Sequence, residues 1–94
     1  MDDASEDRRL GLTNIRAAVR GLCDPLGATV EDNGDQMSIF DDVVFWVESQ
    51  DGRQLPVTFY IADIQDSHEQ VAPTARQAIR ELAAELKRPH PTAA

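Results

Sequence analysis

The residues best suited to chemistry lie in one polar stretch, where His68 stands among acidic side chains. Asp63, Asp66 and Glu69 surround it in the sequence. A histidine beside carboxylates is typical of a metal site or of a general base. The same residue types also occur where a loop histidine lies beside the acids at the start of a helix. We favour this interpretation over a metal site or a general base. The second histidine, His90, lies between two prolines, and we expect it to be inert.

Other candidate motifs lack the spacing that their chemistry needs. Cys23 precedes Asp24, whose charge would raise the thiol pKa, so we favour a buried thiol over a nucleophile. Residues 32–35 resemble part of a calcium loop but lack its full ligand spacing and its closing glutamate. Asp41 and Asp42 are adjacent, and on a strand their carboxylates would point to opposite faces. We therefore expect no enzyme activity, no metal and no cofactor.

Size and composition indicate one domain of an intracellular protein. The chain has 94 residues, enough for one modest core and too few for two domains. Its acidic start lacks the basic and then apolar run of a secretory signal, and no apolar run approaches the ~20 residues of a membrane span. The single cysteine cannot form an internal disulfide, so we expect a cytoplasmic protein.

The net charge of −8 is confined to the middle of the chain. Residues 1–23 balance four acids with four bases, residues 71–94 carry a net charge of +2, and residues 24–70 hold eleven acids against Arg53 alone. This charge opposes direct binding to nucleic acids and to anionic membranes. It favours docking on a basic surface of another protein, while solubility is the plain alternative.

The acids expected to contact such a partner lie in two stretches, residues 31–42 and 63–69, and on the strand between them. They are Glu31, Asp32, Asp35, Asp41, Asp42, Glu48, Asp63, Asp66 and Glu69.

Helical periodicity appears near both ends of the chain. Apolar residues at helical spacing predict a first helix over residues 7–23, with Thr13 as an alternative, later N-cap. A last helix begins at residues 72–74, with a proline in its first turn, and ends before residue 89. We expect the remaining terminal residues to form flexible tails, residues 1–7 and 89–94.

Between the helices the sequence predicts strands and turns. Residues 27–32 form a short strand, and Asn33-Gly34 is a hairpin signal that returns the chain as a strand over residues 36–40. Asp41-Asp42 fits either a turn or a bulge within one longer strand.

The clearest hairpin follows. Residues 43–48 are β-branched or aromatic up to Glu48 and predict a strand. A turn at residues 50–52 leads into a partner strand over residues 55–62, and residues 63–70 form a polar loop. The expected fold is α+β, with a helix, three or four antiparallel strands and a helix, and with both helices on one face of the sheet.

A three-residue loop at residues 50–52 sets the pairing of the two strands. One face then carries only apolar residues and forms the core: Val43, Phe45, Val47, Leu55, Val57, Phe59 and Ile61. The other face carries a mixture: Val44, Trp46, Glu48, Gln54, Pro56, Thr58 and Tyr60. A two-residue turn would instead place Trp46 in the core.

Trp46 and Tyr60 are the candidate anchors of a protein-binding patch on that second face. Alternatively, the two rings stack as a cross-strand pair that only shields the sheet. The face could also contact a second copy of the chain and form a homodimer.

The order helix, three strands, helix resembles that of double-stranded RNA-binding domains. The resemblance stops there, because those domains place lysines at the start of the second helix, where this chain reads Ala72-Pro73-Thr74-Ala75-Arg76 after an acidic loop. We reject RNA binding. In composition alone, the chain resembles immunity proteins, antitoxins and phage-encoded inhibitors of bacterial defence systems.

Three functional hypotheses follow. The first is a non-enzymatic acidic module that occludes a basic surface on a partner protein, as an inhibitor or a nucleic-acid mimic. The second is a homodimeric structural or chaperone-like subunit that associates through the open sheet face. The third is a small enzyme or metal-binding domain around His68.

Overall fold

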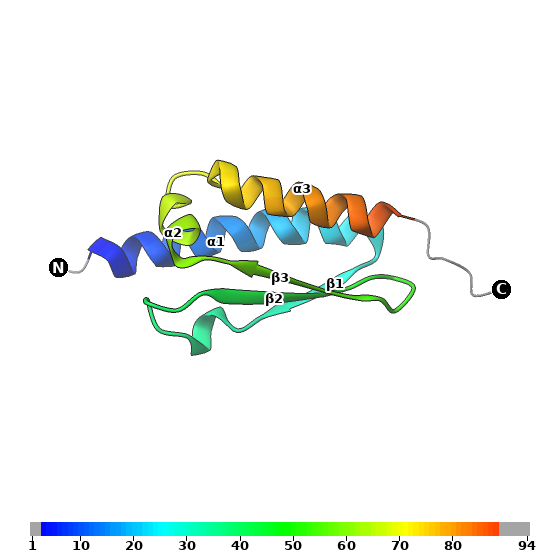
Figure 1. Ribbon diagram of the computed structural model, residues 1–94, viewed down its shortest axis with the longest axis horizontal. Coiled ribbons are helices and arrows are strands. Elements are labelled where there is room, and N and C mark those ends of the chain that lie inside the picture. Colours follow the sequence, from blue (N-terminus) through cyan, green and yellow to red (C-terminus); the bar gives the residue numbers. More distant parts are fainter. Residues whose placement is uncertain (1–2, 89–94) are drawn as a thin grey trace.

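The protein folds as two layers, with helices on one side of a three-stranded antiparallel sheet. The computed structural model describes residues 3–88, and their side chains from residue 5 onward. The strands lie in the order β1-β2-β3. The helices α1, α2 and α3 all lie on the same side of this sheet (Figure 1). The expected α+β fold is therefore confirmed, with three strands rather than four.

Helix α1 (Asp3–Cys23) begins earlier than its apolar pattern indicated. The chain is helical from Asp3, so the expectation of a tail is wrong for residues 3–7; residues 1–2 and 89–94 lie outside the described part. Thr13 is not an N-cap, because its hydroxyl donates to the carbonyl oxygen of Arg9 one turn earlier at 2.9 Å. The buried stripe of α1 consists of Leu12, Ile15, Val19 and Cys23.

A short 3-10 turn, η1 (Asp24–Leu26), ends α1 and turns the chain toward the sheet. Gly27 follows with φ of 69°, a left-handed conformation that glycine adopts without steric cost. Strand β1 (Thr29–Asp32) then pairs directly with β2 (Val43–Glu48). The residues between these two strands, 33–42, are called the connector below.

The predicted hairpin at Asn33-Gly34 and the strand over residues 36–40 are wrong. Asn33 has φ of −101°, and Gly34–Gln36 form a 3-10 turn, η2. Asn33 instead closes the end of the β1–β2 ladder: its N–H donates to the Val44 carbonyl at 3.3 Å, and its Oδ1 accepts from the Val44 N–H at 3.0 Å. Asp41 and Asp42 lie in the connector before β2, so they are not a bulge within a strand.

The second hairpin has the predicted register. Strand β3 (Gln54–Phe59) pairs with β2 so that Val47 lies opposite Leu55 and Phe45 opposite Val57. The Ser49 N–H donates to the Arg53 carbonyl at 2.8 Å, and Gly52 has φ of 90°. The loop therefore has the three residues that the sequence indicated, and Trp46 lies outside the core.

Strand β3 ends three residues earlier than the predicted range of 55–62, and a helix takes the place of the first part of the predicted loop. Helix α2 (Ile61–Asp66) starts where the Asp42 carboxylate accepts from the Ile61 N–H at 2.9 Å. A carboxylate at this position satisfies a backbone N–H that has no partner within the helix. Ile61 thus leaves the sheet, and the loop prediction is wrong for residues 63–66.

Helix α3 (Pro73–Lys87) begins with proline in its first turn, as predicted. Ser67 joins α2 to α3: its buried hydroxyl donates to the Asp63 carbonyl at 2.7 Å and accepts from the Ala72 N–H at 2.9 Å. Asn14 of α1 donates to the Ser67 carbonyl at 2.7 Å. One short segment therefore holds three helices together.

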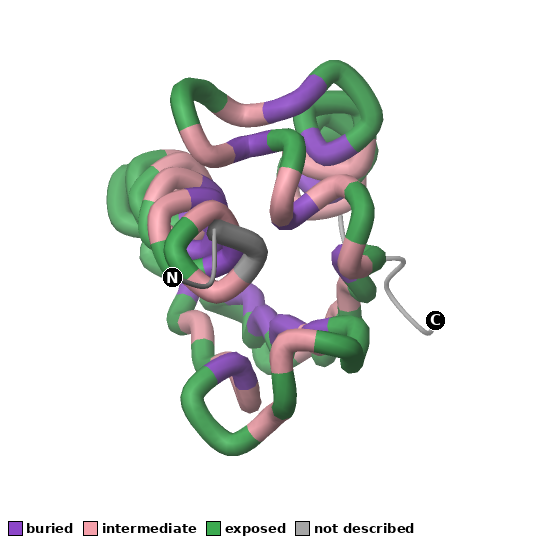
Figure 2. The backbone as a smooth tube through the Cα atoms, turned by 90° about the vertical axis from the view of Figure 1, so that its left-hand side faces the viewer, coloured by how far each residue is buried: buried purple, intermediate pink, exposed green. Residues whose placement is uncertain are grey.

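The hydrophobic core fills the space between the layers. Phe45 and Phe59 make an edge-to-face contact with ring centroids 5.1 Å apart, and Ile15 and Val19 of α1 belong to the same buried cluster. Figure 2 shows the buried positions on the sides of α1 and of the sheet that face each other. Among residues 3–88, no helix is both long enough and apolar enough to cross a membrane.

Replacing Gly11 with alanine tests the close approach of α1 to α2. A Cβ atom at Gly11 would lie 1.7 Å from the Ile64 carbonyl oxygen, so one helix must move. We expect Gly11→Ala to lower the free energy of unfolding by about 2–4 kcal/mol in urea titrations. The matched control is Gly21→Ala on the same helix, where the new methyl meets open space. The control should stabilise the protein by about 0.5–1 kcal/mol. Equal effects of both substitutions would contradict this packing.

Candidate functional site

The open face is the side of the sheet that the helices leave uncovered, and Trp46 lies at its centre. Antiparallel pairing places Glu31 of β1 on one side of Trp46 and Pro56 of β3 on the other. Trp46 is 46% exposed, whereas its neighbours along β2, Phe45 and Val47, are fully buried. The described residues of the open face are Thr29, Glu31, Val44, Trp46, Glu48, Gln54, Pro56 and Thr58.

The open face carries acidic but no basic side chains among these residues. Glu31 and Glu48 are both exposed, and they line a shallow hollow of about 400 Å³ together with Trp46. An exposed indole between two carboxylates offers apolar contact area and negative charge at one place. Such a surface is suited to a partner that brings a cationic side chain over the ring.

Tyr60 does not stack on Trp46. The register places Trp46 opposite Pro56, and Tyr60 follows the last residue of β3, so the predicted cross-strand stacking of the two rings is wrong. Within residues 5–88, Phe45 and Phe59 are the one aromatic ring pair. Tyr60 is 59% exposed and lines a different hollow, between β3 and α3.

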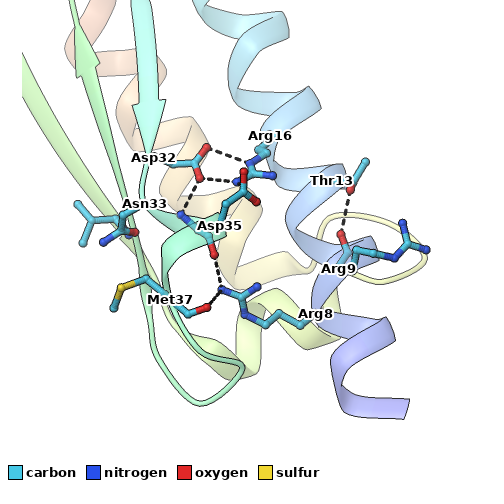
Figure 3. A network of polar contacts seen from close by, with 10 residues as sticks. Arg8, Arg9, Thr13, Arg16, Asp32, Asn33, Asp35 and Met37 are labelled. Carbon is cyan, nitrogen blue, oxygen red and sulfur yellow. Dashed lines mark hydrogen bonds and ion pairs between the residues drawn. The ribbon is translucent and has the colours of Figure 1, made fainter. Parts of the chain in front are cut away.

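Two of the predicted docking acids are bound by a cation of α1. The Arg16 guanidinium donates to both carboxylate oxygens of Asp32, at 2.6 and 2.9 Å, and to Asp35 at 3.1 Å (Figure 3). The Gly34 N–H also donates to Asp32 at 2.8 Å. Burial raises the pKa of Asp32, but the hydrogen bonds from Arg16 and Gly34 outweigh it and hold the pKa below its usual value.

The connector acids Asp41 and Asp42 are exposed but also have internal partners. Asp41 accepts from the backbone N–H and the hydroxyl of Ser38, at 3.3 and 2.9 Å, and closes a tight turn. Asp42 caps α2 through Ile61, as described above. Both side chains have a role in folding, and their role in partner binding stays a prediction.

The acids of α2 and its C-terminal flank lie on the helix side of the molecule. Asp63 accepts from the Thr74 hydroxyl at 2.5 Å, which links α2 to α3. Asp66 and Glu69 are exposed. Because the helices cover the opposite face of the sheet from Trp46, these three acids and the open face do not form one continuous site (Figure 1).

The imidazole of His68 contacts residues close to it in the chain, Gln65 and Glu69. Its Nδ1 is 3.0 Å from the Gln65 carbonyl oxygen, and its Nε2 is 3.7 Å from Glu69. Among residues 5–88, no group of three or more histidine, cysteine or acidic side chains has the geometry to hold a metal ion. Cys23 is buried, and burial together with Asp24 raises its pKa. His90 lies outside the described residues.

Phe40 is a candidate contact residue that the sequence pattern concealed. Its side chain is 79% exposed, although residues 36–40 read as a strand. The Ser38 hydroxyl accepts from the Phe40 N–H at 3.1 Å, and the Asp41 N–H donates to the Ser38 carbonyl at 3.1 Å. These bonds hold Phe40 in a turn. Serine three residues before aspartate is the signal of such a turn in the sequence.

The connector is fixed to α1 by a buried arginine. Arg8 is 9% exposed and donates to the carbonyl oxygens of Gly34 at 2.8 Å and Met37 at 3.3 Å (Figure 3). Its Nε is buried without a hydrogen-bond partner among the described residues. The guanidinium thus holds the backbone at the first residue of η2 and directly after its last one, so the segment that leads to the exposed turn around Phe40 is fixed to α1.

No protein-family model, no curated protein and no solved structure matches this chain.

The contact between Arg16 and Asp32 predicts a specific pH dependence. Asp32→Asn should lower the free energy of unfolding by about 1–3 kcal/mol near neutral pH, because Arg16 loses its charged partner in a half-buried place. The native pKa of Asp32 is depressed, so its stabilisation is complete above the unfolded pKa of about 3.9 and is lost as the pH falls through the lower native value.

Urea titrations of wild type and variant at neutral pH and at about pH 2.5 check this expectation. The difference between the two proteins should shrink in acid. Asp35→Asn is the control, because Asp35 binds the same arginine through a largely exposed side chain and should cost less than about 0.5 kcal/mol. A difference for Asp32→Asn that is independent of pH would contradict the assignment.

Proposed function

We propose that this chain is a non-catalytic module that docks its open face on a basic surface of another protein. The observation that carries the proposal is the exposed Trp46 between Glu31 and Glu48, on a face whose described residues include no base. Tryptophan is enriched among the residues that dominate binding energy in protein interfaces. The two glutamates define the charge of the surface that fits them.

The positions of the charges support a basic partner. Two basic side chains of α1 near the connector have partners within the molecule: Arg16 binds Asp32 and Asp35, and Arg8 binds backbone carbonyls. Glu31 and Glu48 have no ion pair among the described contacts. Arg16 and Arg20 of α1 line a hollow with Glu31 at the β1 edge, but no base lies among the described residues of the open face itself. A negative face favours a cationic counterpart such as a site that ordinarily holds phosphate groups.

Phe40 supports docking of the same kind. It projects from a turn that is already ordered, so burying its ring in an interface costs little loss of conformational freedom. Asp41 and Asp42 follow it in the turn, and both are exposed. An apolar ring next to carboxylates repeats, on the connector, the combination that Trp46 and its two glutamates make on the sheet.

Self-association through the open face is less favourable. In a symmetric dimer the same patch meets itself, so the glutamates of two copies would be brought together without a described base between them. Like charges in such an interface oppose association. We therefore prefer a different protein as partner and treat a homodimer as an outcome that contradicts the proposal.

Trp46→Ala tests the proposed anchor. We expect binding to the captured partner to weaken at least ~30-fold, since removal of a central interface tryptophan costs about 2 kcal/mol or more. Because the indole is half exposed and lies outside the core, the free energy of unfolding should change by less than about 1 kcal/mol. Immobilised wild type and variant are compared for capture from the host lysate, and affinity is then measured with the purified partner.

Three results would contradict the proposal: a partner that lacks a basic surface, unchanged affinity of the variant, or a wild-type mass in solution that corresponds to a dimer lost on substitution. Gln70→Ala, an exposed position in the segment between α2 and α3, is the control and should bind nearly as wild type.

Salt dependence tests the charge complementarity separately. The association rate constant should fall about tenfold or more as the ionic strength rises from about 0.01 M to 0.15 M, because screening weakens the long-range attraction. Glu31→Gln combined with Glu48→Gln should flatten this dependence. Asp66→Asn, an exposed acid on the helix side, is the control and should leave most of the slope unchanged. An association rate that is insensitive to salt would argue against electrostatic docking.

A further inference from the structure

A second candidate surface is a groove between helix α3 and β3, which is an edge strand of the sheet. The groove has a volume of about 420 Å³. Its walls are the outer part of β3 with Tyr60, and one side of α3. The lining residues are Leu55, Pro56, Val57, Thr58, Tyr60, Ala78, Glu81, Leu82 and Glu85. Pro56 and Thr58 also belong to the open face, whereas Trp46, Glu31 and Glu48 are not among the lining residues, so this β3–α3 groove adjoins the open face along β3.

The groove exists because α3 covers the edge strand incompletely. Leu55 and Val57 belong to the core-facing side of β3, opposite Val47 and Phe45. Their partners on β2 are fully buried, whereas Leu55 and Val57 remain half-buried. The α3 wall consists of Ala78, Glu81, Leu82 and Glu85, and Ala78 contributes only a methyl group to it. The side chains of Leu55 and Val57 thus remain partly accessible in the groove.

The rim of the groove is acidic. Glu81 and Glu85 line the α3 wall one helical turn apart, and none of the lining residues is basic. Glu85 makes an exposed ion pair with Arg88 at 3.1 Å, which is weak and leaves the carboxylate available. The exposed ring of Tyr60 lines the groove beyond the end of β3, and tyrosine is enriched in protein interfaces.

The edge of β3 argues against an added strand as the occupant. In an antiparallel pair, every second residue of a strand bonds to its neighbour, and the Ser49 N–H to Arg53 carbonyl bond shows which residues of β3 do so. The backbone groups of Gln54, Pro56 and Thr58 therefore point away from β2. Pro56, in the middle of this edge, has no N–H to donate. A helix needs no hydrogen bonds from the groove, because its own backbone supplies them.

We propose that the β3–α3 groove binds a basic amphipathic helix of a partner protein. Its apolar side chains at positions i, i+3, i+4 and i+7 contact Leu55, Val57 and Ala78, and lysine or arginine beside them meets Glu81 and Glu85. Four residues of β3 line the groove, Leu55 to Thr58, a length of roughly 13 Å that corresponds to about 9 residues of helix. This inference concerns a groove that adjoins the open face at Pro56 and Thr58 but is not lined by Trp46, so it does not depend on the function proposed for Trp46.

A titration with a synthetic peptide tests the inference. The probe is a blocked peptide of about 14 residues, with leucine at helical spacing on one face and lysine beside it. We expect the methyl resonances of Leu55, Val57 and Ala78 to shift on binding. Peptides with glutamate in place of lysine, or with valine and lysine alternating at strand spacing, should bind at least ~10-fold more weakly. No binding, or equal binding of either control peptide, would overturn the inference.

Variants locate the binding. Ala78→Leu fills the groove from within α3 and should weaken peptide binding at least ~10-fold, while leucine is a good helix former at this half-buried place. Glu81→Gln with Glu85→Gln serves as a second variant that leaves the packing unchanged and should give a similar loss. Trp46→Ala should bind the peptide as wild type. Loss of peptide binding on Trp46→Ala, or wild-type affinity of both groove variants, would overturn the assignment to this groove.

Discussion

The alternation of side chains along β2 is the constraint on which the rest of the molecule depends. Val43, Phe45 and Val47 are fully buried, and the side chains between them point to the other side of the sheet. As the central strand, β2 transmits this alternation to both neighbours through their register. The helices can cover one side only, so the same spacing that builds the core also brings a tryptophan to the surface.

The acidic residues fall into two kinds once their partners are known. Asp32, Asp42 and Asp63 each bind a group from a distant part of the chain and thereby hold the connector, α2 and α3 in place. Glu31 and Glu48 have no such internal partner among the described contacts, and they flank Trp46. A high negative charge in the sequence therefore combines carboxylates that support the fold with carboxylates that remain available for other molecules.

Local chemistry made much of this fold predictable. The hairpin register, the start of α3 at Pro73 and the outward position of Trp46 all follow from residues close together in the chain. The failures have a common origin in contacts between distant residues. Asn33-Gly34 is a strong hairpin signal, but the contacts of Asn33 with Val44 and of Arg8 with Gly34 override it. The exposure of Phe40 was missed for the same reason. Residues 36–40 have the pattern of a strand, but β1 pairs with β2 and not with this segment.

The way in which Arg8 holds the connector has a consequence for how this segment can evolve. Arg8 binds carbonyl oxygens, and every amino acid supplies one, so the attachment does not depend on which side chains stand at Gln36 or Met37. The buried Gly34 is the position that steric contact with α1 restricts. Gln36 and Phe40, which are exposed and whose side chains make no described bond, can change identity while the path of the backbone is kept. At these positions the connector can diversify the surface that it presents without redesign of the fold.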